Sequence, residues 1–389
     1  MAITAAVSEE PGVTAARAVH EVVAAHRDDA ERDARMHDDA RDALGEARLF
    51  AAVAPAECGG MDLTLPDLWR TVELLSEADP TVAWHVANSG IAGLLSVRLD
   101  ATVRAQVYAD PSYPYGNGAV PVGRALAVDG GFRLRGRWPF VTGSDHARWL
   151  VLSGLIDDGT GSAAQYGSGA ARVFVVPSSD VQIEHTWSAS SAMRGTGSNP
   201  VRVEDVYVAN QFVVGWTAPP LIDRPMNNIS RPLGFGGMMA SLQLGVLRTA
   251  IDGVWELAGE AVSDLHGGRH ADQPRFQQVI AEAEAALDAM RSSWFAIADE
   301  LWSAAEQGEV PLSTRARGFG AMFHISDSTR HQVSNLYSIA THGAYRTRNR
   351  VERALRDIHA AAASTESLRG VQRDVARVLA GGDPLSPAF

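Results

Sequence analysis

The chain contains 389 residues, 46% of them hydrophobic and 21% charged, which is typical of a globular protein with two or three structural domains. Its formal net charge of −12 argues against nucleic acid or an anionic membrane as a partner, because both attract basic patches. The single cysteine, Cys58, excludes an intrachain disulfide, and no apolar run approaches the roughly 18 residues of a membrane span, so a cytoplasmic location is predicted.

The first part of the chain, residues 1–115, is predicted to be helical. Residues 13–50 combine alanine and charged residues with apolar positions at helical spacing, and residues 65–78 form a second amphipathic pattern. A further helix begins at Asp79, where a proline follows in the first turn. The aspartates within residues 28–39 lie among arginines, which indicates a solvated helix face, and no metal site is predicted.

The second part, residues 116–225, has the pattern of a β domain. Three prolines and two glycines within residues 111–121 mark the boundary before it. Short apolar or alternating segments then recur between turn signals, which predicts an antiparallel β-barrel or sandwich. The glycine- and serine-rich residues 159–169 are expected to form a surface loop. The predicted strands cover residues 125–128, 132–140, 149–155, 173–176, 181–183 and 201–208.

The third part, residues 226–389, returns to helical periodicity. Four long amphipathic patterns with short connections predict a four-helix bundle. The fold class is therefore predicted to be a multidomain α+β protein, in which a helical domain precedes a β domain and a helical bundle follows it. The four patterns cover residues 236–263, 273–307, 314–340 and 350–379.

One stretch of the β region combines aromatic rings with short hydroxyl side chains. A planar cofactor with polar edges needs apolar surface for a ring face and short hydrogen-bonding groups for its heteroatoms. The same residues also fit a β-hairpin with a polar tip, so both interpretations stay open for the stretch alone. Its sequence is Trp138-Pro139-Phe140-Val141-Thr142-Gly143-Ser144.

Three motifs, in this order along the chain, resemble those of the acyl-CoA dehydrogenase superfamily. The first is similar to Pro-x-x-x-Gly-Gly and reads Pro55-Ala56-Glu57-Cys58-Gly59-Gly60. The second is similar to Gly-Met-Arg-x-Thr-x-Ser, with Ala192 for the first glycine, and reads Met193-Arg194-Gly195-Thr196-Gly197-Ser198. The third is similar to an Arg-x-x-Arg-Asp helix and reads Arg353-Ala354-Leu355-Arg356-Asp357. The resemblance covers nearly the whole chain and implies the same order of domains.

Within the superfamily, residues 138–149 resemble the group D two-component flavin monooxygenases. The acidic segment typical of the dehydrogenases is missing from residues 116–121, and their catalytic glutamate has only the out-of-register Glu366 as a counterpart. The histidine that group D enzymes commonly have on the last long helix is replaced by Ser364. His85 and His342 are the candidate substitutes for acid–base catalysis.

The resemblance implies a monooxygenase in which a reduced flavin reacts with oxygen at its C4a carbon. The resulting hydroperoxide would hydroxylate a small organic substrate or oxidise it at nitrogen or sulfur. It further implies a separate NAD(P)H-dependent reductase that supplies the reduced flavin by diffusion, a homotetramer, and a role in specialised metabolism. The missing pyrophosphate motif, with Gln273 and Gln277 at the relevant positions, slightly favours FMN over FAD.

The candidate site residues fall into three groups. The catalytic candidates are His85, Ser144, Ser364 and His342. The flavin-binding candidates are Trp138, Phe140, Thr142, Gly143, Ser144, Arg194, Gly195, Thr196, Ser198, Arg356 and Asp357. The candidates for lining the substrate pocket are Trp84, Tyr113, Trp187 and Phe235.

Two alternatives to the monooxygenase interpretation remain. An FAD-dependent acyl-CoA dehydrogenase or oxidase would need a carboxylate base near the flavin, for which Glu366 is the candidate. A flavin-binding homologue without catalytic activity would explain the absence of a histidine at Ser364. The identity of the substrate does not follow from the sequence.

Overall fold

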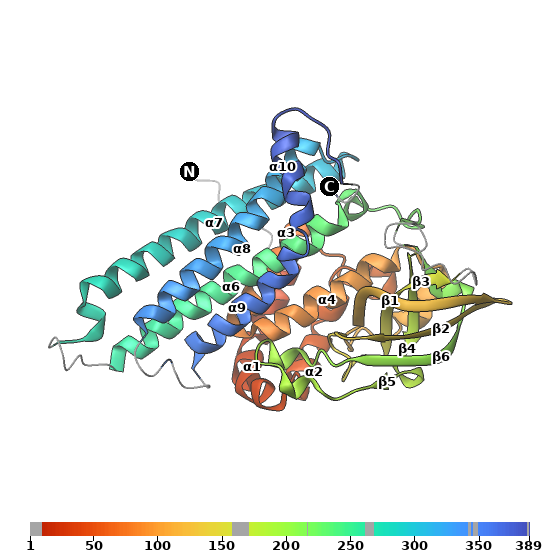
Figure 1. Cartoon of the computed structure of the whole chain (residues 1–389), viewed down its shortest axis with the longest axis horizontal. Helices are drawn as coiled ribbons and strands as arrows, with labels where there is room; N and C mark the ends of the chain where they lie inside the picture. The colour runs from red at the N-terminus through yellow and green to blue at the C-terminus, as the bar shows by residue number, and fades with distance from the viewer. Residues whose placement is uncertain are drawn as a thin grey trace, which may run out of the picture.

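The computed structural model describes residues 10–157, 171–215, 217–260, 268–340, 344, 349–386 and 389. The chain forms helices, then a β-sheet, then helices again, as predicted (Figure 1). The expected loop at residues 159–169 and the candidate His342 both lie outside the described residues. No helix in the described part of the chain is long and apolar enough to cross a membrane.

The helices that begin after Thr64 and Asp79 have side-chain caps at these residues. The Thr64 side chain accepts a hydrogen bond from the backbone N–H of Asp67, and Asp79 accepts one from Thr81 at 2.8 Å. The helix that Asp79 caps is almost entirely buried, because it lies between α6 (Arg231–Glu260) and the start of the sheet (Figure 1). The helices are α1 (Pro11–Asp33), α2 (Asp38–Glu46), α3 (Leu65–Ala78), α4 (Pro80–Ser96) and α5 (Ala101–Val107).

The strands form one seven-stranded sheet of order β5-β6-β2-β1-β3-β4-β7. The prediction of a purely antiparallel domain is wrong, because β1 and β3 pair in parallel. Since β2 and β3 flank β1 on opposite sides, residues 139–148 cross over the sheet and do not close a hairpin. The strands are β1 (Gly116–Val128), β2 (Gly131–Trp138), β3 (Trp149–Asp157), β4 (Ala171–Pro177), β5 (Gln182–Ile183), β6 (Val201–Ala209) and β7 (Val213–Val214).

The long C-terminal helices α6 to α9 lie side by side (Figure 1). They share one hydrophobic core with α1, α3 and α4, and in this core the ring of Trp69 stacks on Trp294 at 4.4 Å. The helix predicted over residues 350–379 is divided in two by a short turn that includes Gly370. The helices are α6 (Arg231–Glu260), α7 (Pro274–Glu306), α8 (Leu312–Ile339), α9 (Arg350–Glu366) and α10 (Gln372–Leu379).

Candidate active site

A chain of hydrogen bonds connects α4 to two loops of the β region. The indole Nε1 of Trp84 donates to the hydroxyl of Thr142 at 3.0 Å, and this hydroxyl lies 2.9 Å from that of Ser198. Ser198 donates to the Thr196 hydroxyl at 2.9 Å, and Thr196 donates to the carbonyl oxygen of Met193 at 2.7 Å. All three hydroxyl residues are buried. The chain therefore joins two predicted motifs, residues 138–144 and residues 193–198.

The donor-to-acceptor order of these hydrogen bonds determines whether the Thr142 hydroxyl can still donate or accept a hydrogen bond. A hydroxyl group has one proton to donate and two lone pairs. Ser198 gives its proton to Thr196, so Thr142 is the donor in its own contact with Ser198. Trp84 occupies one lone pair of Thr142. The remaining lone pair is an acceptor, and it suits a ligand that brings an N–H or O–H group.

Backbone contacts hold the two loops together. The N–H of Gly143 donates to the Thr196 carbonyl at 3.2 Å, and the Ser144 hydroxyl donates to the Gly197 carbonyl at 3.3 Å. Gly143 and Gly197 have φ angles of 77° and 50°, a left-handed backbone that favours glycine. Ser144 is only 1% exposed. The structure therefore gives Ser144 and Gly143 a part in shaping the loop that carries Thr142.

His85 is fully buried behind this loop. Its Nε2 lies 3.2 Å from the Gly195 carbonyl, which can only accept, so Nε2 carries the ring proton. Its Nδ1 has no hydrogen-bond partner, and a Cβ atom added to Gly143 would lie 3.2 Å from it. Burial lowers the pKa of His85 to about 3, so the ring is neutral near pH 7. The contacts indicate a positioning role and do not show a path for proton exchange.

Two asparagines, absent from the sequence-based candidates, extend the site. Asn88 donates to the Trp84 carbonyl at 2.9 Å, and Asn117 donates to the Asn88 side-chain oxygen at 3.4 Å. Asn117 also forms an isolated β-bridge with Thr142. One available signal is the position of Asn88, an amide side chain one turn after Trp84 in a largely apolar helix.

Phe140 and Trp187 form an aromatic pair beside the hydroxyl chain. The rings meet edge to face with centroids 6.1 Å apart, and Phe140 is 63% exposed. The Trp187 indole donates to the Met193 carbonyl at 3.3 Å, which connects the pair to the end of the chain. An exposed aromatic ring next to buried hydroxyls matches the predicted combination of apolar surface and short polar groups.

Trp138, Arg194 and Gly195, three of the predicted flavin-binding residues, make packing and hydrogen-bond contacts within the protein. Trp138 is fully buried in the core of the sheet, and its Nε1 donates to the Ser153 carbonyl at 2.8 Å. The guanidinium of Arg194 donates to the carbonyl of Glu31 at 2.7 Å and to two carbonyls in residues 188–190 at 2.6 Å. A Cβ atom at Gly195 would lie 2.3 Å from the Thr81 hydroxyl, so glycine is needed there for packing against α4.

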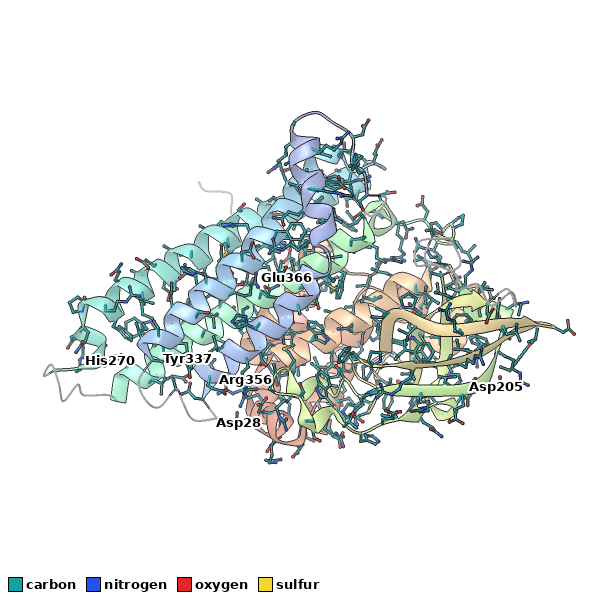
Figure 2. The ribbon with its side chains drawn as sticks, in the orientation of Figure 1. Asp28, Asp205, His270, Tyr337, Arg356 and Glu366 are labelled. Atoms are coloured by element: carbon teal, nitrogen blue, oxygen red, sulfur yellow. The ribbon has the colours of Figure 1, made fainter. Side chains whose placement is uncertain are left out.

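Arg356 and Asp357 attach α9 to the rest of the molecule. Arg356 pairs with Glu31 at 2.9 Å and with Glu352 at 2.6 Å, and Figure 2 shows it on the part of α9 next to the N-terminal helices. The fully buried Asp357 accepts the backbone N–H of Met193 at 2.6 Å. Burial raises the pKa of Asp357 to about 7. Both residues support the loop of residues 193–198 from behind.

Three further candidates make their recorded contacts outside the hydrogen-bond chain from Trp84 to Met193. Tyr113 packs under the guanidinium of Arg148, 3.8 Å from its ring centre, and Phe235 packs against the helical core. Ser364 is partly exposed in the last turn of α9, and its carbonyl accepts a hydrogen bond from Ser367. In the described structure, no hydrogen bond joins Ser364 to the Trp84–Met193 chain.

Glu366, the candidate base for dehydrogenation, is exposed at the far end of α9 (Figure 2). Its carboxylate pairs with Arg369 at 3.0 Å and with Arg330 at 3.1 Å. The hydrogen bond from Arg369 lowers the pKa of Glu366. A carboxylate held in this way, away from the sheet, does not meet the geometric requirement for a base beside a flavin.

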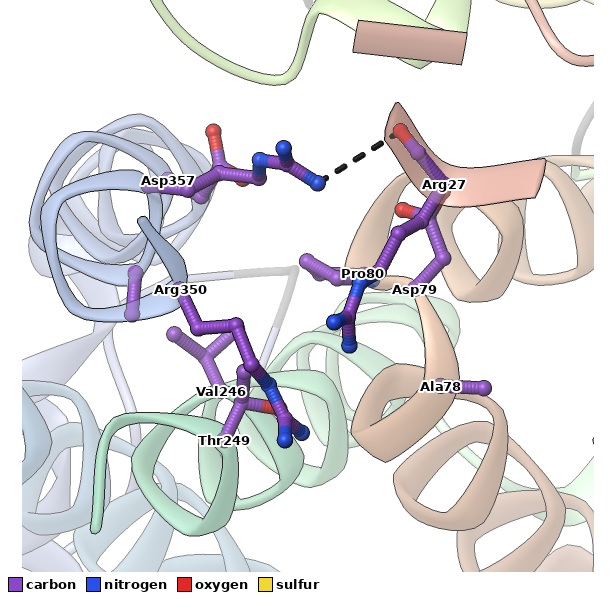
Figure 3. A pocket seen from close by; sticks show the side chains of 10 residues that line it. Arg27, Ala78, Asp79, Pro80, Val246, Thr249, Arg350 and Asp357 are labelled. Atoms are coloured by element: carbon purple, nitrogen blue, oxygen red, sulfur yellow. Dashed lines mark hydrogen bonds between the residues drawn. The ribbon is translucent and has the colours of Figure 1, made fainter. Parts of the chain in front are cut away.

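A small cavity lies among α1, α4, α6 and α9 (Figure 3). Its volume is about 20 Å³, which is enough for a water molecule and far too small for a flavin. Three polar atoms of residues that line it have no hydrogen-bond partner: Arg350 Nε, Arg353 Nε and Asp357 Oδ2. The dashed contact in the figure joins Arg353 to the Arg27 carbonyl at 3.4 Å. This cavity is consistent with an ordered water that supports the α9 junction.

Two family profiles match the chain. The profile for the acyl-CoA dehydrogenase N-terminal domain matches residues 12–100, and that for the acyl-CoA dehydrogenase C-terminal domain matches residues 237–365. Together they cover more than half of the chain, which belongs to the acyl-CoA dehydrogenase superfamily. The resemblance predicted from the three motifs is confirmed.

Relatives of the chain include proteins named as monooxygenases. The chain is 29% identical over 287 residues to indole-3-acetate monooxygenase of Pseudomonas putida, covering 72% of this chain and 71% of that protein. It is 27% identical over 338 residues to the oxygenase subunit HsaA, named a flavin-dependent monooxygenase, of Rhodococcus jostii. That match covers 84% of this chain and 86% of the relative.

Solved structures share the whole fold. XiaF from Streptomyces sp., solved in complex with FADH2 and glycerol, superposes with a TM-score of 0.86 at 23% identity and covers 97% of each chain. The dibenzothiophene monooxygenase TdsC from Paenibacillus sp., solved with FMN and indole, superposes with a TM-score of 0.79 at 17% identity. It covers 96% of this chain and 98% of its own. At these identities the superpositions establish the fold.

Proposed function

We propose that the protein is the oxygenase component of a two-component flavin-dependent monooxygenase. It uses reduced flavin from a separate NAD(P)H-dependent reductase and molecular oxygen to hydroxylate a small organic substrate, or to oxidise it at nitrogen or sulfur. The observation that carries the proposal is the free lone pair of Thr142 at the head of the hydroxyl chain. The names of the relatives from Pseudomonas putida and Rhodococcus jostii support the reaction class.

The polarity of the Thr142 site fits a reduced flavin. The N5 atom of a reduced flavin carries a hydrogen, whereas N5 of the oxidised ring can only accept a hydrogen bond. Thr142 has an acceptor to offer and no free proton, so it favours the reduced ring. Phe140 and Trp187 provide apolar surface for the ring, and Trp84 borders the substrate side in this proposal. When bound, the reduced flavin supplies the activation of oxygen.

The protein's own part is to hold the site rigid and to exclude water. The Trp84–Thr142 bond and the neutral His85 fix α4 against the loops that carry Thr142 and Thr196. Ser144 and Gly143 keep the crossover in its left-handed turn. Pre-oriented dipoles of this kind stabilise developing charge without reorganising during the reaction. No candidate general base is part of the Trp84–Met193 chain among the described residues.

The finer assignments belong to the same proposal. FMN is favoured over FAD because Gln273 and Gln277 replace the pyrophosphate motif. The domain boundaries are proposed at residues 1–115, 116–225 and 226–389, with a barrel-like β domain and a four-helix bundle that assembles into a homotetramer. A cytoplasmic location and a role in specialised metabolism complete it.

A stopped-flow experiment tests the proposal. The protein is mixed anaerobically with reduced FMN or FAD and then with oxygenated buffer, and flavin absorbance is followed. An oxygenase predicts that bound reduced flavin reacts with oxygen before oxidised flavin reappears, so two phases are resolved. A single phase at the rate of free flavin would support the inactive homologue. Reduction of tightly bound FAD by an acyl thioester would support the dehydrogenase and overturn the proposal.

A further inference from the structure

Two histidines meet at the corner between α1 and α2. His26 lies near the C-terminal end of α1, and His37 is the N-cap residue of α2, where its Nδ1 accepts the backbone N–H of Asp39 at 3.2 Å. Their rings stack with centroids 3.9 Å apart and planes within 2°. Asp29, almost one helical turn after His26, places its Oδ2 3.5 Å from His26 Nδ1. Two imidazoles and one carboxylate, which are side chains that commonly bind metal ions, therefore lie close together.

The arrangement leaves one histidine nitrogen of the cluster without a hydrogen-bond partner. His26 Nδ1 is shielded from solvent and has no hydrogen-bond partner. Arg32 pairs with Oδ1 of Asp29 at 2.5 Å, which leaves Oδ2 facing the histidine. One ligand atom from each of His26, Asp29 and His37 lies within 4.8 Å of the other two. Ligand atoms around tetrahedral zinc lie roughly 3.4 Å apart, so a small side-chain rotation brings them into range.

We propose that His26, Asp29 and His37 bind one divalent first-row transition metal ion, with zinc as the best fit. Imidazole and carboxylate groups are preferred zinc ligands, and the partly exposed side chains leave a fourth position for water. The local charge suits a cation, because residues 26–42 contain six aspartates and one glutamate against four arginines. This site departs from the sequence-based expectation that these aspartates only form a solvated face.

Asp39 provides the outer support that metal-bound histidines usually have. Its Oδ2 lies 3.3 Å from His26 Nε2 and 3.9 Å from His37 Nδ1. A carboxylate that accepts the N–H of a metal-bound imidazole fixes the tautomer of the ring. Because the lone pairs of parallel rings do not converge, the His37 ring has to rotate for the ion to bind, and its unprotonated Nδ1 then exchanges the Asp39 backbone N–H for the metal.

The proposed ion also has a mechanical consequence. The segment between the two histidines supports the loops of the candidate active site: the Glu31 carbonyl accepts from Arg194 at 2.7 Å, and the Met36 carbonyl accepts from His146 at 3.0 Å. An ion bound to His26 and His37 ties both ends of this segment together. Metal binding to the folded state alone raises its stability by mass action.

Zinc titration of the full, untagged chain after dialysis against a chelator tests the site. Isothermal titration calorimetry is expected to show one zinc ion per chain. Substitution His37→Ser keeps an N-cap residue for α2 but removes the imidazole, and Asp29→Asn keeps the shape of the side chain. Each is expected to weaken binding by more than about tenfold, since even outer-shell partners contribute that much. His331→Ala, at an exposed histidine on α8 that contacts Asn335, is the matched control and should bind zinc like the wild type.

Cobalt substitution gives a second measurement, because a tetrahedral site with nitrogen ligands has intense visible absorption that octahedral aqueous cobalt lacks. The wild type and His331→Ala are expected to show this visible absorption, and His37→Ser and Asp29→Asn are expected to lose it. Absence of stoichiometric zinc binding, or binding that survives either His37→Ser or Asp29→Asn, overturns the site. Melting temperatures without metal confirm that each variant is folded, and Asp29→Asn, at a surface ion pair, carries the test if His37→Ser unfolds.

Discussion

The indole of Trp84 and the hydroxyl of Thr142 form a hydrogen bond of 3.0 Å across the boundary between α4 and the crossover from β2 to β3. The bond joins residues 58 positions apart and orients Thr142 so that its proton points to Ser198. The consequence is an acceptor at the head of a buried hydroxyl chain. This relationship makes the candidate site selective for a ligand with a hydrogen to donate.

Replacing Thr142 with valine removes the acceptor without changing the shape of the side chain much. We expect reduced-flavin affinity to fall by about fivefold, because a net hydrogen bond contributes about 1 kcal/mol and a tenfold change in binding corresponds to about 1.4 kcal/mol. Anaerobic titration with reduced FMN measures the effect, and oxidised FMN should lose less. Thr329→Val is the control, because Thr329 is equally buried and bonds only within the helical core. Equal losses in both variants would remove Thr142 from the flavin site.

A double-mutant cycle tests the Trp84–Thr142 bond itself. Trp84→Phe and Thr142→Val are each expected to lower the free energy of unfolding, whereas the double variant should be less destabilised than the sum of the two. The coupling energy is expected to be about 1 kcal/mol, a typical value for contacting residues that share a hydrogen bond. Urea unfolding of the four proteins measures it. Full additivity would mean that the bond does not contribute to stability in solution.

Two glycines of α6 should respond in opposite directions to alanine. A Cβ atom at Gly237 would lie 1.9 Å from the indole of Trp69, which is fully buried and stacked on Trp294. Gly237→Ala is therefore expected to cost about 1–3 kcal/mol of stability or more. Gly259 has no heavy atom within 4 Å of its Cβ position, so Gly259→Ala should stabilise α6 by roughly 0.5–1 kcal/mol. Thermal unfolding compares them, and a tolerated Gly237→Ala would show that Trp69 can move.

His146 predicts a pH dependence of stability. Burial and the nearby Arg35 lower its pKa to about 4 in the folded protein, whereas an unfolded histidine has a pKa of about 6.5. Between these values the unfolded chain binds a proton that the folded chain does not. The free energy of unfolding therefore falls as pH decreases through this range, by up to about 1.4 kcal/mol per pH unit from this residue.

The substitution His146→Gln isolates that contribution. A glutamine amide can still donate to the Met36 carbonyl, but it does not titrate. We expect the stability advantage of the wild type over the variant to shrink between pH 7 and pH 5, as measured by urea unfolding at each pH. The buried His85 is present in both proteins, and its folded-state pKa of about 3 lies below the pH range of the comparison. A difference that stays constant with pH would mean that the pKa of His146 is the same in the folded and unfolded states.

The fold was accessible from the sequence to a large extent. Apolar spacing, prolines in first turns and caps such as Asp79 depend on neighbours in the chain, so helical segments were predicted close to their observed positions. The parallel pairing of β1 with β3 was missed, because strand runs and turn signals contain no information on which strands become neighbours. For the same reason, the sequence of residues 139–148 did not distinguish a hairpin turn from the observed crossover between β2 and β3.

The sequence by itself determined the superfamily and the presence of aromatic and hydroxyl residues at positions 138–144. Only the tertiary structure decided which of them share a site. Trp138 and Phe140 are two residues apart, yet one ring fills the sheet core and the other is exposed. Thr142 forms a hydrogen bond with Ser198, 56 positions away in the sequence, and Asn117 forms a β-bridge with Thr142. Side-chain direction and long-range hydrogen bonds depend on how the sheet packs against α4, and that packing arises from the whole core.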